Sequence, residues 1–288
     1  MGHIALPSQA GTGLIVHGEA LALLGGLPDG CAGLVYADPP FNTGTRRDAI
    51  RVRGTRDEAA TRRGFAGAGY RTERSATPGY DDAFGDYIGW LRPHCVETRR
   101  VLAAHGTFYL HVDPRESHYC KVLLDEVFGR DCFLNEVIWA YDYGARATRR
   151  WPAKHDVILV YARTSGAHHF DLAAVDRIPY MAPRLQTHDR AARGKTPTDV
   201  WWHTIVPTNS RERTGYPTQK PLGVLRRIVA ASSRADDIVV DWCAGSGTTA
   251  AAVQCLGRRF VVGDRSAEAV TVMRRRLGQD VPLLDLTA

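Results

Sequence analysis

The sequence lacks several features that would assign it to a common protein class. Its six cysteines are scattered and none form a Cys-x-x-Cys pair, which gives no support to a zinc-ribbon or thioredoxin-like fold. No apolar run is long enough to cross a bilayer, and the first residues show no basic segment followed by an apolar stretch that would indicate export. Scattered cysteines in a chain of this length indicate buried thiols in a reducing cytosol, so we expect a cytoplasmic protein without membrane contact.

Internal repeats and low-complexity tracts are also missing. The chain has 288 residues, of which 44% are hydrophobic, and this is enough for one sizeable α/β core. Its formal net charge is +6. A basic balance favours a polyanionic partner, but it is equally typical of a soluble arginine-rich protein, so the position of the charge matters more than its sum.

Short apolar runs and amphipathic stretches alternate along most of the chain, and this alternation predicts an α/β fold. The expected strands are residues 14–17, 33–37, 107–112, 134–140, 157–162, 238–240 and 260–262. The expected helices are residues 18–25, 86–104, 115–128, 219–231, 248–256 and 267–277.

Two segments interrupt the alternation. Residues 42–80 contain several glycines, little apolar periodicity, and nine arginines against four acidic residues. We expect a long loop here, which is either solvated or becomes ordered on DNA, since counterion release rewards clustered arginines. Residues 164–215 also look irregular and mix basic residues with aromatic ones, among them Trp201 and Trp202.

The sharpest local motif runs from Asp241 to Thr249, with the sequence Asp-Trp-Cys-Ala-Gly-Ser-Gly-Thr-Thr. It follows a strand and opens a helix. Gly245 and Gly247 allow close approach of a ligand to the backbone, and the helix start offers free N–H groups. The next strand ends at Asp264, where an acidic side chain can bind the hydroxyls of a ribose.

Other ligands for this glycine motif are less consistent with the sequence. A nicotinamide cofactor matches the glycine spacing, but only 24 residues follow Asp264, too few for a second mononucleotide-binding half. Asp241, just before the glycines, suits a cation or an amine better than a pyrophosphate. A P-loop is excluded because no Lys-Ser or Lys-Thr follows the glycines. A glycine-rich turn without a ligand remains an alternative.

A second motif, Asp38-Pro39-Pro40-Phe41, follows the strand at 33–37, where open α/β sheets bind ligands. The exocyclic amine of adenine or cytosine is a poor nucleophile because its lone pair is delocalised into the ring. Asp38 can accept one hydrogen of such an amine, and a rigid proline turn can aim a backbone carbonyl at the other. Phe41 offers a face on which an extruded base can stack. The alternative is an ordinary turn capped by Asp38.

Together the two motifs resemble the amino-methyltransferases that act on DNA. Residues 216–221, Tyr-Pro-Thr-Gln-Lys-Pro, are similar to that family's Pro-Thr-Gln-Lys-Pro segment, and residues 84–91 and 111–129 are similar to the segments between. The catalytic motif precedes the glycine motif, which is the β-class order. The resemblance covers nearly the whole chain except residues 42–80 and 164–215.

The resemblance implies a seven-stranded, Rossmann-like α/β sheet with a DNA-recognition insertion. Residues 1–163 would form the catalytic half, with 42–80 as a flexible DNA-binding loop. Residues 164–215 would recognise the target, and 216–288 would form the cofactor-binding half. The implied cofactor is S-adenosylmethionine and the implied partner is double-stranded DNA. A homodimer and a restriction endonuclease are further candidate partners.

Individual roles also follow from the resemblance, and no metal is needed to transfer a methyl group that is already activated as a sulfonium. The catalytic residues would be Asp38, Pro39, Pro40 and Phe41. The cofactor-binding residues would be Thr218, Lys220, Asp241, Cys243, Ala244, Gly245, Ser246, Gly247, Thr248 and Asp264. The DNA-contacting residues would be Asn42, Arg46, Arg47, Trp201 and Trp202, and Tyr36 is a further candidate for the base pocket.

The chain departs from the family pattern at a few positions. Relatives commonly carry Tyr where this chain has Phe41, which can stack but cannot donate a hydrogen bond. Trp242 and Cys243 replace the usual aromatic pattern of the glycine loop, and Asp264 stands where Glu is frequent.

The first catalytic residue indicates the target base. Family members that methylate adenine N6 mostly carry Asp or Asn before the two prolines, whereas those that methylate cytosine N4 mostly carry Ser or Thr. Asp38 therefore favours adenine, with cytosine as the alternative. Three other functions stay open: a methyltransferase acting on RNA or protein, a nicotinamide-dependent oxidoreductase, and a catalytically silent nucleic-acid-binding relative.

Overall fold

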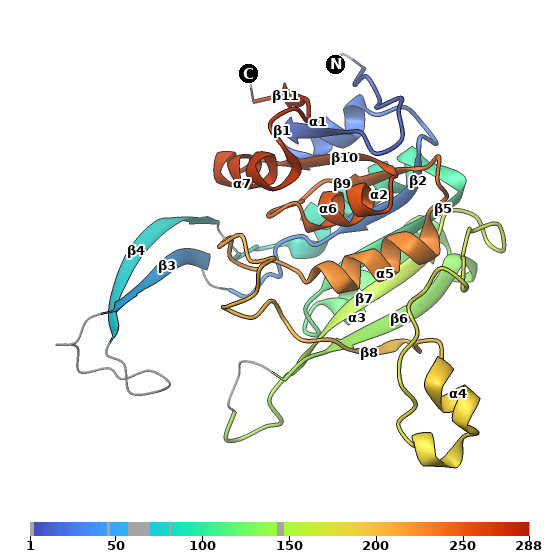
Figure 1. The fold of residues 1–288 in the computed structure, drawn as a ribbon. Coiled ribbons are helices and arrows are strands. Elements are labelled where there is room, and N and C mark those ends of the chain that lie inside the picture. Colours follow the sequence, from blue (N-terminus) through green and yellow to red (C-terminus); the bar gives the residue numbers. More distant parts are fainter. Residues whose placement is uncertain (1–2, 45–46, 57–69, 81, 143–146, 288) are drawn as a thin grey trace.

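The computed structural model describes residues 3–44, 47–56, 70–80, 82–142 and 147–287, and only the backbone of 47–56 and 70–80. Its main sheet contains strands β1 (Gly13–His17), β2 (Ala32–Ala37), β5 (Leu102–Val112), β6 (Phe133–Ala140), β7 (His155–Ala162), β8 (Val200–Trp202), β9 (Ile238–Asp241), β10 (Arg259–Asp264) and β11 (Leu283–Asp285). Their order is β11-β1-β10-β9-β2-β5-β7-β6-β8 (Figure 1). Only β7 runs antiparallel to its neighbours in this sheet. The predicted Rossmann-like α/β arrangement is therefore confirmed.

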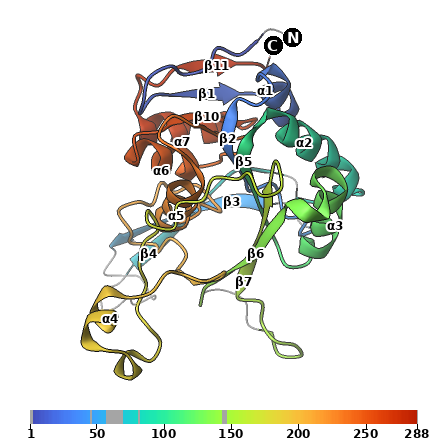
Figure 2. The same ribbon diagram turned by 90° about the vertical axis from the view of Figure 1, so that its right-hand side faces the viewer.

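Helices cover both faces of the sheet. Figure 2 shows α1 (Ala20–Gly26), α2 (Tyr87–Val101) and α3 (Ser117–Phe128) on one side, with α5 (Leu222–Ser232), α6 (Thr248–Cys255) and α7 (Ala267–Leu277) on the other. A short helix α4 (His188–Arg193) lies within the irregular segment 164–215. Because helices pack on both faces, the central strands are buried on both sides, which explains why they appear in the sequence as continuous apolar runs.

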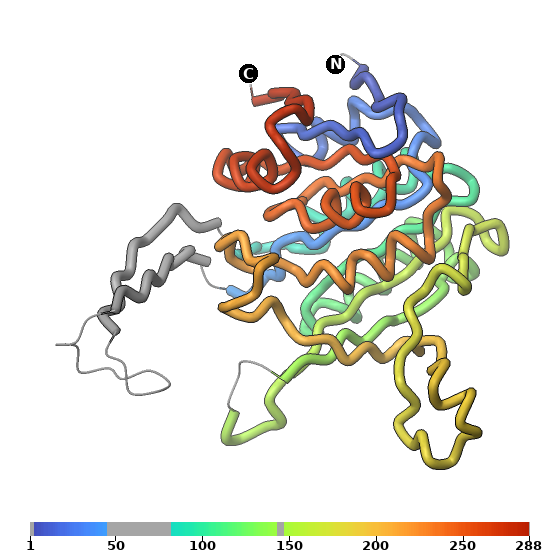
Figure 3. Tube along the Cα trace, viewed as in Figure 1, coloured from blue at the N-terminus to red at the C-terminus, as the bar shows by residue number. Residues whose placement is uncertain are grey.

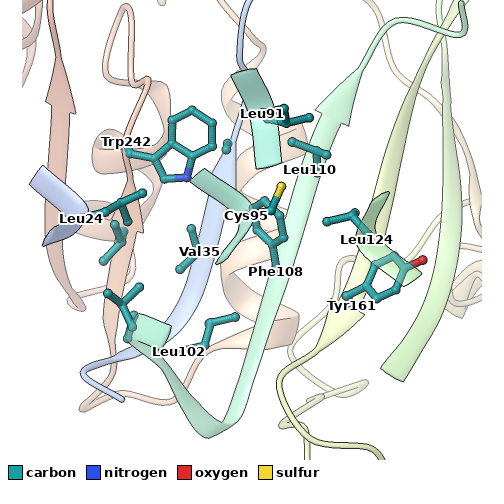
Figure 4. Packing of buried hydrophobic residues seen from close by; sticks show 14 of the residues in the cluster. Leu24, Val35, Leu91, Cys95, Leu102, Phe108, Leu110, Leu124, Tyr161 and Trp242 are labelled. Carbon is teal, nitrogen blue, oxygen red and sulfur yellow. The ribbon is translucent and has the colours of Figure 1, made fainter. Parts of the chain in front are cut away.

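The core consists of two clusters, one on each face of the sheet. Successive residues of β2 point to opposite faces, as the twofold period of a strand requires. Leu34 and Tyr36 pack toward α5, α6 and α7, whereas Val35 packs with residues such as Phe108 and Trp242 (Figure 4). All six residues of β2 are buried. Strand β2 is therefore packed on both faces up to Ala37, the residue before Asp38.

The sheet has nine strands rather than the expected seven. The two extra strands, β8 and β11, have three residues each and lie at opposite edges, so they are too short to give a sequence signal. The long helix expected over 86–104 ends at Val101, and Leu102 already begins β5. Strand β8 comes from the segment expected to be irregular and pairs with β6.

The expectation of a long irregular loop over residues 42–80 was wrong in part. Strands β3 (Arg47–Arg56) and β4 (Tyr70–Tyr80) pair antiparallel and form a separate two-stranded sheet. Residues 57–69 lie outside the described residues. The two strands are rich in arginine and poor in apolar residues, so their pairing depends on backbone hydrogen bonds that side-chain periodicity does not reveal.

The two ends of the described chain lie on the same side of the molecule (Figure 3). Strand β1 pairs with β10 and β11, which explains this arrangement. None of the helices in the described ranges is both long and apolar enough to cross a membrane.

Candidate active site

The two sequence motifs meet at one edge of the sheet. Strands β2 and β9 are parallel neighbours, so Asp38 after β2 and Asp241 at the end of β9 lie at the same carboxyl edge. The backbone N–H of Asp38 donates a hydrogen bond of 3.1 Å to Sγ of Cys243. Residues from both motifs line a cavity of about 510 Å³, called the first cavity below.

The glycine turn brings backbone close to the first cavity. Gly245 and Gly247 have φ angles of 50° and 71°, which favour glycine. A Cβ atom on Gly245 would lie 3.1 Å from the ring of Tyr216, and one on Gly247 would lie 2.8 Å from Met273. The backbone N–H groups of Gly245 and Ser266 donate to the two carboxylate oxygens of Asp264, each at 2.9 Å. Asp264 therefore orders the turn and also faces the cavity.

Among the charged side chains of the first cavity, carboxylates outnumber cations. The cavity is lined by Glu19, Asp38, Asp241, Asp264 and Glu268, against Lys220 and Arg265 as basic side chains. Burial raises the pKa of Asp241 to about 7, although the Thr249 hydroxyl donates to it at 2.6 Å, and burial also raises the pKa of Asp264. A ligand with positive charge would favour the ionised forms of these buried carboxylates, whereas a pyrophosphate would be repelled by them.

The other predicted cofactor residues surround the same cavity. Six of them line it: Thr218, Lys220, Cys243, Ala244, Ser246 and Thr248. Gly247 does not line the cavity and is the N-cap residue of α6. Thr248 donates a hydrogen bond of 3.1 Å to the carbonyl of Lys220, which links the glycine turn to the segment before α5. Thr218 has a φ angle of 59°, a strained conformation for a β-branched residue.

A second cavity of about 1140 Å³ adjoins the first. Asp38 and Lys220 line both cavities, as do the residues 216–218. Within the catalytic motif, Pro40 lines the first cavity, while Pro39 and Phe41 line the second. Asp38 therefore lies at the junction between a site suited to a cofactor and a larger site suited to a substrate.

Lys220 contacts two groups of the catalytic motif. Its Nζ lies 2.9 Å from Oδ1 of Asp38 and 4.7 Å from the centre of the Phe41 ring. The Asp38 oxygen is buried, and the Lys220 ammonium at 2.9 Å is its ionic partner. Lys220 therefore occupies the acceptor oxygen of Asp38.

Sequence analysis missed a buried polar chain behind Asp38. The hydroxyl of Tyr36 lies 2.8 Å from Nδ1 of His111, and Nε2 of His111 lies 3.0 Å from Oδ2 of Asp156. Tyr141 donates to Oδ1 of Asp156 at 2.9 Å. His111 interrupts the apolar run of β5, and Asp156 directly precedes the apolar run of β7. Buried polar positions of this kind indicate a functional site. Their proximity requires the antiparallel pairing of β5 with β7, which the sequence does not show.

The predicted DNA-contacting residues lie in different places. Trp202 lines the second cavity with 77% of its surface exposed. Trp201 is 8% exposed and packs in the core, where its indole N–H donates to the Thr198 carbonyl. Arg47 begins β3, and Arg46 lies outside the described residues.

Asn42 ties the loop after β2 to neighbouring segments. Its backbone N–H donates to Asp82 at 2.7 Å, and its side chain donates to Glu116 and accepts from the backbone N–H of Phe84. Its φ angle of 52° lies in the left-handed region, which Asn tolerates better than most residues. Asn42 is not among the residues that line either cavity.

Comparison with known proteins agrees with this geometry. The DNA methylase family, of the N6/N4 type, matches residues 32–275. The chain is 26% identical over 274 residues to the DNA adenine methyltransferase YhdJ of Escherichia coli, covering 91% of this chain and 82% of that protein. It is also 26% identical over 266 residues to the type II methyltransferase M.HpaI of Haemophilus parainfluenzae, covering 92% and 74%.

Solved structures share the fold at low sequence identity. The complex of M1.HpyAVI with S-adenosylmethionine matches with a TM-score of 0.59 and 16% identity, over 92% of this chain and 99% of that one. The cytosine-N4-specific PvuII DNA methyltransferase matches with a TM-score of 0.61 and 13% identity, over 99% and 100%. The chain belongs to the N6/N4 DNA methylase family.

Proposed function

We propose that this protein is a site-specific DNA methyltransferase that modifies the exocyclic amine of a flipped base, adenine N6 in the first place. The observation that carries the proposal is the position of Asp38 at the junction of the two cavities. A methyl donor in the first cavity and a base in the second would meet at this carboxylate.

The cofactor is S-adenosylmethionine, which supplies a methyl group already activated by a positively charged sulfur. The residues of the first cavity fit this molecule. Their carboxylates would favour its positive charge, and Asp264 would accept hydrogen bonds from its ribose hydroxyls. The turn at Gly245 leaves the backbone open to close approach of the cofactor.

Asp38 would hold and polarise the target amine. Its carboxylate would take one hydrogen of the amine, so that the nitrogen turns pyramidal and its lone pair faces the first cavity. Pro39 and Pro40 would fix the loop, because each proline has a restricted φ. The ring of Phe41, in the wall of the second cavity, would stack on the flipped base.

Adenine is favoured over cytosine by the carboxylate at the first catalytic position and by the resemblance to an enzyme named as an adenine methyltransferase. Cytosine N4 is the second candidate, because the fold is shared with a cytosine-N4-specific enzyme. RNA is a weaker alternative, since the family that matches is described as acting on DNA.

The DNA surface would combine the arginine-rich strands β3 and β4, the exposed Trp202 and the segment 164–215 around the second cavity. Clustered arginines bind the phosphate backbone of any duplex, whereas residues beside the cavity would read the target. A homodimer and an endonuclease with the same recognition site are further proposals, drawn from the resemblance to modification enzymes such as M.HpaI.

Single-molecule sequencing of DNA from cells that express this chain would test the proposal, because it reports the modified base and its sequence context together. We expect a methylated adenine within one short recurring sequence. Cells that express Asp38→Ala should show no such modification. An identical modification pattern with and without active enzyme would contradict the proposal.

A further inference from the structure

The ammonium group of Lys220 occupies the place that the proposed function assigns to the target amine. It lies beside the acceptor oxygen of Asp38 and over the ring of Phe41 at the same time. A base that stacks on Phe41 and donates its amine hydrogen to Asp38 needs both of these positions. Lys220 must therefore move when the base enters.

A second carboxylate is close enough to receive Lys220. Oδ2 of Asp156 lies 4.0 Å from Nζ, compared with 2.9 Å for Oδ1 of Asp38. Charged N–H···O contacts are shortest at about 2.7–2.9 Å, so a shift of about 1 Å would exchange one partner for the other. Both Lys220 and Asp156 line the second cavity.

Asp156 is held rigidly and stays ionised. Tyr141 donates to its Oδ1 and His111 contacts its Oδ2. Burial raises the pKa of Asp156, but the hydrogen bond from His111 and the charge of Lys220 lower it to about 2. An ionised carboxylate only accepts, so Nε2 of His111 donates to Asp156, while Nδ1 contacts the hydroxyl of Tyr36.

We propose that Asp156 is a positioning residue that receives Lys220 when the target amine takes its place at Asp38. This inference rests on the proposed function. Among the described residues, Asp38 and Asp156 are the carboxylates within 4.0 Å of the Lys220 ammonium, so without Asp156 the lysine would compete with the amine for Asp38. With Asp156, the cation stays in the acidic cluster while Asp38 becomes free, and the buried chain of His111 and Tyr36 keeps the receiving carboxylate in place.

A double-mutant cycle on the full-length protein tests this coupling. The variants are Asp156→Asn, Lys220→Gln and the double variant, with kcat and the KM for duplex DNA measured together with the affinity for S-adenosylmethionine by calorimetry. We expect Asp156→Asn to lower kcat about 10- to 100-fold, as misplacement of a catalytic group does. Cofactor affinity should be unchanged. In the Lys220→Gln background, Asp156→Asn should cause no further loss.

The chain offers a matched control. Asp125 is also a carboxylate that pairs with a lysine, Lys121 at 2.7 Å, and accepts from a tyrosine hydroxyl, Tyr161 at 2.7 Å, but it lies outside both cavities. Asp125→Asn makes the same chemical change and should leave kcat unchanged. Equal losses in the two variants, or losses that multiply in the double variant, would overturn the inference.

Two further outcomes separate this inference from the proposed function. If the wild-type protein methylates DNA and the Asp156→Asn variant is fully active, the inference is overturned but the proposed function stands. If the wild-type protein is inactive, the proposed function itself is contradicted. If Asp156→Asn does not fold, Tyr141→Phe removes one hydrogen bond to Asp156 and keeps its charge. It should lower kcat in the wild-type background but not in Lys220→Gln, and a loss in both would overturn the inference.

Discussion

The backbone N–H of Asp38 donates its hydrogen bond to Sγ of Cys243, which is 205 residues later in the chain. This contact joins the loop after β2 to the glycine turn after β9. Burial keeps the Cys243 thiol neutral by raising its pKa well above the ordinary value, so it serves as an uncharged acceptor. Asp38, which would hold the base, and the glycine turn, which would hold the cofactor, are thus joined to each other before either ligand binds.

The first prediction separates the roles of two carboxylates. Asp38→Ala should abolish methyl transfer and still bind S-adenosylmethionine, because Asp38 faces the target amine. Asp264→Ala should weaken cofactor binding, since each charge-assisted hydrogen bond contributes about 1.5–3 kcal/mol. Calorimetry with the cofactor alone measures both affinities. Loss of cofactor binding in Asp38→Ala would show that the roles are divided differently.

The second prediction concerns the pH dependence of stability. Burial raises the pKa of Asp241 from 3.8 to about 7. Between these values the folded protein holds a proton that the unfolded chain has released, so stability should fall as the pH rises from about 4 to about 7. Each pH unit in this range corresponds to about 1.4 kcal/mol.

Chemical denaturation at pH 5 and pH 7 would measure this fall. Asp241→Asn should flatten the curve, because the amide cannot ionise. Asp156 acts in the opposite direction, since its pKa is lowered to about 2, but its stabilisation is lost only at more acidic pH. A curve of unchanged slope in Asp241→Asn would show that another group is responsible.

The third prediction uses two adjacent tryptophans as each other's control. Trp202→Ala should raise the KM for DNA with little effect on stability, within about 0.5 kcal/mol, because the side chain is exposed. Trp201→Ala should destabilise the fold by about 3–5 kcal/mol, because its indole is buried and Arg227 packs over it. Denaturation curves and DNA titrations distinguish the two effects, and a reversal of the pattern would refute this assignment.

The fourth prediction tests strands β3 and β4 as the phosphate-binding surface. Replacing Arg51, Arg53, Arg71 and Arg74 with Gln should weaken binding to cognate and unrelated duplexes alike. The slope of log K against log salt should become shallower by about 0.9 for each phosphate that the variant no longer neutralises. Exposed arginines on α5 and α7, Arg226 and Arg275, provide matched controls. An unchanged slope would assign phosphate binding to residues 164–215.

The central strands of the fold could be predicted because their signal is local. Strands β2, β9 and β10 are short apolar runs, and burial on both faces requires that composition. Asp38 follows β2, while Asp241 and Asp264 are the last residues of β9 and β10. The glycine turn could be predicted for the same reason, since Gly245 and Gly247 adopt backbone conformations that disfavour other residues. These features also identify most of the wall of the first cavity.

The remaining features depend on pairing between distant segments. Strands β8 and β11 have three residues each and form only because an edge of the sheet is available. The contact of His111 with Asp156 requires β7 to run antiparallel to β5, so that the start of one strand lies beside the end of the other. The burial of Trp201 beside the exposed Trp202 follows from the pairing of β8 with β6. None of these relationships is encoded in a local pattern.

Nucleoside analysis by mass spectrometry tests the central claim most directly. Purified protein is incubated with unmethylated duplex DNA and S-adenosylmethionine carrying a deuterated methyl group, and the DNA is then digested to nucleosides. Wild-type protein should produce deuterated N6-methyladenine, and Asp38→Ala should produce none. N4-methylcytosine without N6-methyladenine would contradict the assignment of the base, and the absence of any labelled nucleoside would contradict the methyltransferase activity itself.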